Sequence, residues 1–101
     1  MSTQPDITID RQDDGTRGRY AGRIDGIEGE AELVYTRKSD GLRTADHAEA
    51  PTTMRGTGAA LALVERLIAD ARREDFKIQP RCSYVRHQFG QHPEWDDVLA
   101  K

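Results

Sequence analysis

A short glycine loop that leads directly into an amphipathic helix is the most constraining feature of this sequence. The segment Thr52-Thr53-Met54-Arg55-Gly56-Thr57-Gly58-Ala59-Ala60 places two glycines and two alanines where the helix begins. Small side chains leave backbone N–H groups accessible there, and these groups lie at the positive end of the helix dipole. The segment therefore predicts an anion site suited to a phosphate or pyrophosphate.

Apolar residues at helical spacing predict a helix over residues 58–73 that buries one stripe against a sheet. The apolar stripe consists of Ala60, Leu63, Val64, Leu67, Ile68 and Ala71. The charged residues Glu65, Arg66, Asp70, Arg72 and Arg73 are assigned to the other faces of this helix.

Alternating apolar and polar residues before the loop predict strands. Residues 7–10 form a short strand signal that ends in the turn-rich residues 13–15, and residues 19–24 are the next candidate. Residues 30–36 are clearer, with Ala31, Leu33 and Tyr35 on the buried face. Asp25-Gly26 predicts a tight turn between these two strands. Residues 42–50 are interpreted as one or two short strands, with Pro51 preventing further pairing.

Shorter elements follow the main helix. Residues 76–78 form a strand stopped by Pro80, and Ser83 is placed to cap a second helix that Gly90 ends. Pro93 suits the first turn of a final helix. Within these helices Val85 and Phe89 share a face, Trp95 and Leu99 lie one turn apart, and Phe89, Trp95 and Tyr35 are assigned to the core. The order predicts an α/β (α+β layered) domain with a mostly antiparallel sheet.

Composition limits the class of protein. At 101 residues the chain is one domain, residues 1–101, with residues 1–5 as a loose tail. Its 15 basic and 18 acidic residues give a net charge of −3 without a basic block, which argues against nucleic acid as a partner. With neither a membrane-spanning apolar run nor a signal peptide, and with one cysteine, we expect a cytoplasmic protein and no membrane partner. Because no segment marks an interface, we expect a monomer or weak dimer.

Arg55-Gly56-Thr57-Gly58-Ala59-Ala60 resembles the acetyl-CoA pyrophosphate loop of the GNAT (Gcn5-related) N-acetyltransferase superfamily, Q/R-x-x-G-x-G/A, at Arg55, Gly58 and Ala60. The flanking segments, residues 47–51 before the loop and residues 80–85 and 92–94 after it, are similar to small single-domain GNAT-like proteins of the YjdJ type. The resemblance covers about residues 30–98. It departs at Ala48 and Ala50, where larger β-branched residues are expected, so the edge of the cofactor groove is expected to be looser.

The resemblance implies a GNAT-like fold and acetyl-CoA or CoA as the cofactor. It implies that the strand before the loop, residues 47–50, splays from its neighbour and pairs with the pantetheine arm. It also implies that the N–H groups of residues 56–60 receive the pyrophosphate, with Arg55 near a phosphate. The implied cofactor-binding residues are Ala48, Glu49, Ala50, Arg55, Gly56, Thr57, Gly58, Ala59 and Ala60.

Cys82 is the leading candidate for a direct role in acetyl transfer. It lies between a predicted strand and a predicted helix N-terminus and follows Arg81, a placement that favours the thiolate. In the small GNAT-like branch a cysteine at this position is thought to lie beside the acetyl group. The alternative is a small buried residue with an inert sulfur atom.

Three further residues are candidates for proton transfer. His47 can act as a general base because the pKa of histidine lies near neutrality, or it can simply bridge neighbouring groups by hydrogen bonds. Glu49 can deprotonate an ammonium through a water, or remain a solvated charge. Tyr84 can donate a proton to the departing thiolate, as tyrosines do in larger acetyltransferases, or serve packing alone.

Other chemistries fit the sequence less well. His87 and His92 are five residues apart and match no zinc pattern with Cys82, so we predict no metal site. Ala59 and Ala60 stand where a phosphate-binding loop of nucleotide hydrolases needs Lys and Ser or Thr, and Leu61 replaces the third glycine of the dinucleotide fingerprint.

The sequence therefore predicts an acetyl-CoA-dependent N-acetyltransferase that acts on an unidentified amine, either a small molecule or a protein. Two alternatives remain open: a non-catalytic module that binds CoA or acyl-CoA, and a small interaction protein whose loop binds a helix or a phosphate. The chain is short for an acetyltransferase, and we expect it to lack the N-terminal helices that build the acceptor pocket in larger members. An open acceptor site, or one completed by a partner, is expected.

Overall fold

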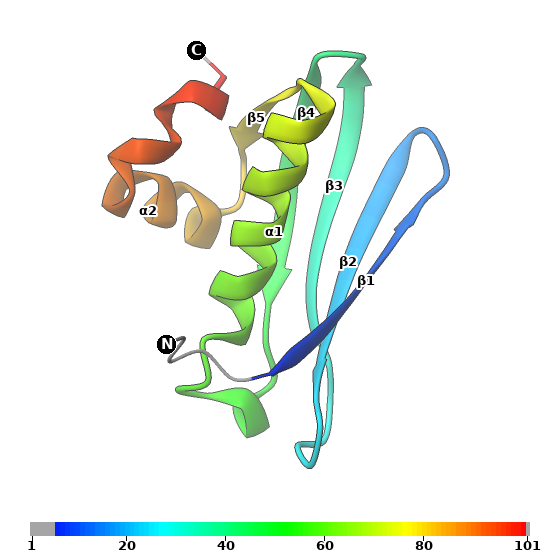
Figure 1. The fold of residues 1–101 in the computed structure, drawn as a ribbon, viewed down its shortest axis with the longest axis vertical. Coiled ribbons are helices and arrows are strands. Elements are labelled where there is room, and N and C mark those ends of the chain that lie inside the picture. The colour runs from blue at the N-terminus through cyan, green and yellow to red at the C-terminus, as the bar shows by residue number, and fades with distance from the viewer. Residues whose placement is uncertain (1–5, 101) are drawn as a thin grey trace.

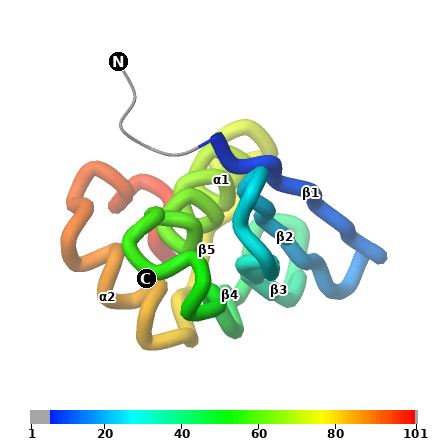
Figure 2. Tube along the Cα trace, turned by 90° about the horizontal axis from the view of Figure 1, so that it is seen from below, coloured from blue at the N-terminus to red at the C-terminus, as the bar shows by residue number. Residues whose placement is uncertain are grey.

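The computed structural model describes residues 6–100, so the tail predicted at residues 1–5 lies outside the described residues. One five-stranded sheet has the order β1-β2-β3-β4-β5, and α1 follows β4 (Figure 1). The elements are β1 (Ile7–Asp13), β2 (Arg17–Ile24), β3 (Ala31–Ser39), β4 (Leu42–Glu49), η1 (Thr52–Met54), α1 (Ala59–Glu74), β5 (Lys77–Pro80), α2 (Ser83–Gln91) and η2 (Pro93–Val98). Seen from below, the helices gather on one side of the strands (Figure 2).

The sheet is mixed but mostly antiparallel, as predicted. Strands β1 to β4 pair antiparallel in sequence order, whereas β5 pairs parallel to β4. A parallel pair needs a crossover connection, and α1 provides it. Helix α1 packs against β1, β2 and β3, while α2 packs against β4 and β5. We call the sheet surface turned away from α1 the open face.

The predicted strands and main helix are confirmed with small changes at their ends. Strand β2 begins two residues earlier than predicted, and β3 extends to Ser39. Residues 42–49 form one strand, β4, with a bulge at Asp46 that shifts the register against β3. A bulge breaks the alternation of side chains, which explains why the sequence pattern was ambiguous there. Helix α1 covers residues 59–74, within one residue of the expectation at each end.

The core lies between α1 and the sheet. Ala31, Leu33 and Tyr35 of β3 are fully buried, as the alternation predicted. The predicted core residues Phe89 and Trp95 are also buried, and their rings meet edge to face. Further members of this core include Leu63, Val64, Leu67, Ile68 and Ala71 of α1, Phe76, Ile78 and Val85.

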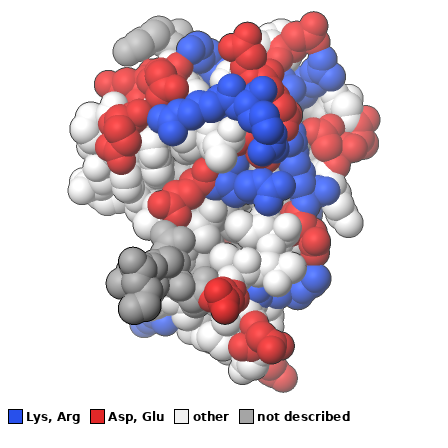
Figure 3. Space-filling view, in the orientation of Figure 1, with Lys and Arg blue, Asp and Glu red and all other residues white. Residues whose placement is uncertain are grey.

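One residue of α1 was assigned to the wrong face. Asp70, expected among the exposed charges, has no solvent-exposed surface. It accepts hydrogen bonds from Tyr20 (2.6 Å) and Arg11 (3.2 Å), and it pairs with Arg66 and Arg73 on its own helix. These partners compensate the burial of a carboxylate. Figure 3 shows Lys and Arg side chains crossing this side of the molecule among acidic residues.

The C-terminal elements differ from the sequence prediction in three respects. The N-cap of α2 is Cys82 rather than Ser83, and no side-chain hydrogen bond caps the helix. Gly90 lies inside α2, which continues to Gln91. The final helix is a 3₁₀ helix, η2, that starts at Pro93 as predicted but ends at Val98, so Leu99 instead bridges to Ile78 of β5. The bridge between Leu99 and Ile78 of β5 thus takes the place of the last predicted helical turn.

None of the helices in the described part of the chain combines the length and the apolar character that crossing a membrane requires.

Candidate functional site

The glycine loop between β4 and α1 has the conformation that only glycine adopts readily. Gly56 and Gly58 have φ angles of 81° and 79°, in the left-handed region. Among the described residues, and apart from the two that adjoin each glycine, no atom lies within 4 Å of the position where a Cβ would stand, so the space above both glycines is open. Met54, which is 2% exposed, anchors the loop in the core. The two glycines therefore allow the backbone to turn with positive φ angles, and they leave its amides accessible.

The loop amides divide into two groups. The N–H groups of Gly56, Gly58 and Ala60 have no hydrogen-bond partner among the described residues. In contrast, Thr57 donates to the Met54 carbonyl (3.1 Å), and Ala59 donates to the Thr57 hydroxyl (3.2 Å). Two of the five amides expected to face an anion are thus used inside the loop. The remaining three, at the start of α1, fit a pyrophosphate.

Contacts to the loop between β2 and β3 hold the glycine loop in place. The Thr53 hydroxyl donates a 2.6 Å hydrogen bond to the carbonyl oxygen of Glu28. Gly29 has a φ angle of 96°, and a Cβ there would stand 2.9 Å from Cγ of Pro51. Sequence reasoning missed this support. Gly29, an isolated glycine beside a turn, was the signal in the sequence. The residue that it contacts, Pro51, lies far from it along the chain, so the contact could not be inferred.

Strands β4 and β5 part beside the glycine loop. They pair from Leu42–Ala45 to Lys77–Pro80, and then Arg81 and Cys82 both donate their backbone N–H to the Ala45 carbonyl (2.9 and 3.0 Å). In the described chain, residues 47–49 of β4 pair with β3 alone, and Asp46 forms the bulge before them. This free edge, which includes Ala48, leads through exposed Ala50 into the glycine loop. It has the geometry expected for holding an extended ligand by backbone hydrogen bonds.

Cys82 and Tyr84 lie together at the start of α2. Cys82 is the N-cap residue, half-buried and packed against the core, with its backbone fixed at the point where β4 and β5 part. Tyr84 is also half-buried. Burial raises the pKa of the Tyr84 phenol, and the nearby Cys82 and Glu65 add to this increase, which a hydrogen bond with Gln88 partly offsets. The phenol is thus protonated at neutral pH and can act as a proton donor.

His47 and Glu49 lie on the open face, away from the core-packed Cys82. Their side chains are 51% and 66% exposed, and His47 Nε2 lies 3.5 Å from a Glu49 carboxylate oxygen. Glu32 of β3 joins them, so that one ligand atom from each of the three side chains lies within 4.8 Å of the others. The structure therefore brings the four predicted catalytic residues together as two pairs, and Glu32 was not identified from the sequence.

The histidines considered for a metal have other surroundings. His92 stacks on Trp95 with ring centroids 4.0 Å apart, and its Nδ1 lies 2.8 Å from the Gln88 carbonyl oxygen. His87 is exposed on α2. Among the described residues, the side chains whose ligand atoms lie within 4.8 Å of one another are Glu32, His47 and Glu49, and His87, His92 and Cys82 form no such group.

Comparisons with known proteins agree with this geometry. Residues 19–98 match the family model described as GCN5-related N-acetyl-transferase. "Protein NATD1" of Xenopus tropicalis is 29% identical over 94 residues, which cover 91% of this chain and 84% of that protein. The NMR solution structure of a GCN5-like protein from Staphylococcus aureus matches with a TM-score of 0.65 and 20% identity, over 98% of this chain and 91% of that chain.

These matches support a small GNAT-like fold, and the narrower YjdJ-type assignment stays a prediction. The family in general transfers acyl groups and uses acetyl-CoA as its co-substrate. The structural match, at 20% identity, concerns the fold alone. The family model, however, spans about four fifths of the sequence. The chain therefore belongs to the GCN5-related N-acetyltransferase family.

Proposed function

We propose that this protein transfers an acetyl group from acetyl-CoA to an amine. The observation that carries the proposal is the free edge of β4, which begins after Ala45 and leads into a loop with three amides that have no partner among the described residues. A ligand with an amide-containing arm and a pyrophosphate needs these two features in this order. The amides of Gly56, Gly58 and Ala60 would hold the pyrophosphate, and exposed Arg55 would contact a phosphate.

Acetyl-CoA, when bound, supplies an acetyl group activated as a thioester. The N–H and C=O groups of residues 46–49 orient the arm of this ligand along the free edge. Tyr84 holds a proton at neutral pH and can give it to a thiolate leaving group. His47 and Glu49 lie on the open face, where either can take a proton from an ammonium. Cys82, at the point where the strands part, is the candidate nucleophile.

A transfer assay tests this proposal. Release of free CoA from acetyl-CoA is followed with a thiol reagent, in the presence and absence of a panel of primary amines, and acetylated products are identified by mass spectrometry. We expect amine-dependent CoA release that saturates with acetyl-CoA. Acetyl-CoA binding without transfer to any amine would instead favour a non-catalytic CoA-binding module. The strong exposure of His47 and Glu49 is the observation that favours this second candidate.

A further inference from the structure

The β2–β3 loop, residues 25–30, lies against the chain that enters the glycine loop, at the lower end of the sheet in Figure 1. The Thr53 hydroxyl of η1 donates its 2.6 Å hydrogen bond to the Glu28 carbonyl oxygen of this loop. Gly29 lies against the same stretch, because a Cβ on Gly29 would stand 2.9 Å from Cγ of Pro51 and 3.4 Å from the Thr53 hydroxyl oxygen. A hydrogen bond and a close packing contact therefore meet at three consecutive residues, 51–53.

The β2–β3 loop is itself fixed to the core. Ile27 is partly buried and packs against the core, to which Ile24 also belongs. The backbone N–H of Ile27 donates a 3.0 Å hydrogen bond to the Ile24 carbonyl oxygen, which closes the turn around Gly26. Packing and hydrogen bonding of this kind raise the free energy of local opening, so the loop can hold a neighbouring segment in one position.

Hydrogen bonds continue from this contact into the glycine loop. The backbone N–H of Met54 donates to the Pro51 carbonyl oxygen (2.9 Å). The Met54 carbonyl oxygen then accepts from both the backbone N–H (3.1 Å) and the hydroxyl (2.6 Å) of Thr57. Since the N–H groups of Gly56 and Gly58 have no partner among the described residues, these flanking bonds decide where the two amides point.

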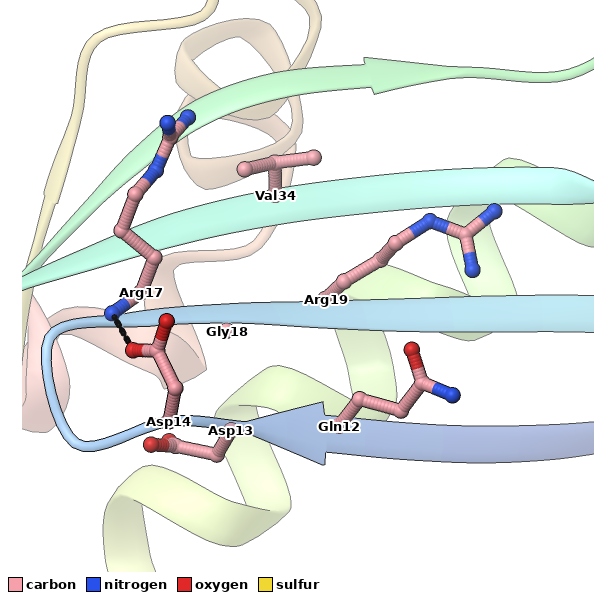
Figure 4. A pocket seen from close by; sticks show the side chains of 7 residues that line it. All are labelled: Gln12, Asp13, Asp14, Arg17, Gly18, Arg19 and Val34. Atoms are coloured by element: carbon pink, nitrogen blue, oxygen red, sulfur yellow. Dashed lines mark hydrogen bonds between the residues drawn. The ribbon is translucent and has the colours of Figure 1, made fainter.

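The turn at the other end of β2 has no such connection. Asp14 accepts hydrogen bonds from the backbone N–H groups of Thr16 (2.9 Å) and Arg17 (2.8 Å), and the second of these is drawn in Figure 4. A shallow pocket of about 490 Å³ lies beside this turn. Among the described residues, no hydrogen bond joins the turn to the glycine loop. Support of the glycine loop is therefore a property of the β2–β3 loop and not of both turns that flank β2.

We propose that the β2–β3 loop sets the affinity for acetyl-CoA, with Thr53 and Gly29 as positioning residues that hold the glycine loop in its binding conformation. The inference rests on the proposed function, because it concerns how the same anion site is held. The apparent Kd of a ligand rises as the fraction of protein in the binding-competent conformation falls. Loosening the contact with the β2–β3 loop therefore weakens binding, although the amides that receive the anion are unchanged.

Removing the Thr53 hydroxyl tests the hydrogen bond. Thr53→Val should raise the Kd of acetyl-CoA about threefold to tenfold, the range that one hydrogen bond contributes, whereas Thr53→Ser keeps the hydroxyl and should bind like the wild type. Thr52→Val is the matched control, because Thr52 is exposed on the same 3₁₀ turn and its hydroxyl has no hydrogen-bond partner among the described residues. Calorimetric titration measures the affinities. The same Kd in Thr53→Val and Thr52→Val would overturn the inference.

The two glycines of the β2–β3 loop test the packing contact. Gly29→Ala places a methyl group 2.9 Å from Cγ of Pro51 at a φ of 96°. Gly26→Ala has a φ of 85°, and its methyl group meets no described residue within 4 Å beyond its chain neighbours. Backbone strain is similar in both variants, so Gly29→Ala alone should displace the glycine loop.

The Kd of acetyl-CoA should therefore rise about tenfold in Gly29→Ala, equivalent to about 1.4 kcal/mol, and by less than about twofold in Gly26→Ala. Similar losses of affinity in the two variants would overturn the inference. If Gly29→Ala does not fold, the Thr53 variants decide the question.

Hydrogen exchange in the ligand-free protein separates this inference from the proposed function. The amides of Met54 and Thr57 should exchange about threefold to tenfold faster in Thr53→Val than in the wild type, while the Leu67 amide within α1 should not change. Unchanged exchange at Met54 and Thr57 would overturn the inference, whether or not acetyl-CoA binds. Faster exchange at these amides, in a protein whose wild type binds no acetyl-CoA, would contradict the proposed function and still support the hold of the β2–β3 loop on the glycine loop.

Discussion

The backbone N–H of Cys82 donates a 3.0 Å hydrogen bond to the carbonyl oxygen of Ala45. This bond, with the one from Arg81 to the same oxygen, lies where β4 and β5 stop pairing. Since both bonds involve only backbone atoms, the separation of the strands does not depend on the Cys82 side chain. The thiol can therefore be changed without moving the free edge of β4, and its chemical role can be tested separately from its structural one.

Cys82→Ser should abolish or strongly reduce acetyl turnover while acetyl-CoA binding stays within about twofold of the wild type. The reason is that a hydroxyl keeps the size of the side chain but is a far weaker nucleophile than a thiolate. Steady-state kinetics and calorimetric titration measure the two quantities. Ser83→Ala, an exposed neighbour, is the control and should change neither. Unchanged turnover in Cys82→Ser would exclude the cysteine mechanism.

Gly58→Ala should weaken acetyl-CoA binding and also cost about 1–2 kcal/mol of stability, because alanine is strained at a φ of 79°. The new methyl group contacts none of the described residues beyond its chain neighbours, but it enters the open space above the loop. Gly15→Ala is a matched control, since Gly15 has a φ of 93° with equally open surroundings in the β1–β2 turn. It should lose similar stability and retain its affinity for acetyl-CoA. Equal affinities in the two variants would contradict the role of the loop.

Asp70→Asn should lower the free energy of unfolding by about 3 kcal/mol, because removing one partner of a buried ion pair leaves uncompensated charge. The carboxylate has no exposed surface and binds Tyr20 and Arg11 from the sheet. Urea denaturation measures the change. The control is Asp97→Asn, which breaks an exposed pair with Arg72 and should cost no more than about 1 kcal/mol. Similar losses in both variants would mean that the Asp70 network contributes little.

Stability should fall between about pH 10 and pH 12. Burial, with a hydrogen bond to Asp13, raises the pKa of Tyr35 from 10.0 to about 12, and burial with a bond to Asp70 raises the pKa of Tyr20. A phenol whose pKa is higher in the folded state contributes stability that is complete below pH 10 and is lost as the pH rises through its folded pKa. Urea denaturation at pH 8, 10 and 11 measures this loss. It should be smaller in Tyr35→Phe; an identical pH profile in that variant would contradict the assignment to Tyr35.

Much of the fold could be predicted because local patterns agreed with the tertiary structure. The alternation of Ala31, Leu33 and Tyr35 gave the buried face of β3, and the apolar spacing after Gly58 gave α1. The pattern failed at Asp70, because a buried carboxylate depends on partners from β1 and β2 that helical spacing does not reveal. It also failed at Gly90, where α2 continues through the glycine.

The candidate site was predicted in part for the same reason. The glycine loop is continuous in sequence, so its positive φ angles and open amides could be expected. Glu32 could not be identified, because its position beside His47 and Glu49 depends on the register of β3 and β4 and on the bulge at Asp46. Cross-strand register is a property of the assembled sheet, so this grouping of Glu32 with His47 and Glu49 becomes visible only in the structure.

Titration of isotope-labelled protein with acetyl-CoA, followed by the backbone amide signals in NMR spectra, tests the central claim most directly. We expect saturable shifts at Gly56, Gly58 and Ala60 that extend along β4 to Cys82, with smaller changes at the Thr57 and Ala59 amides, which are already hydrogen-bonded. An absence of shifts at millimolar acetyl-CoA, or shifts confined to residues far from the glycine loop and the free edge of β4, would contradict the account.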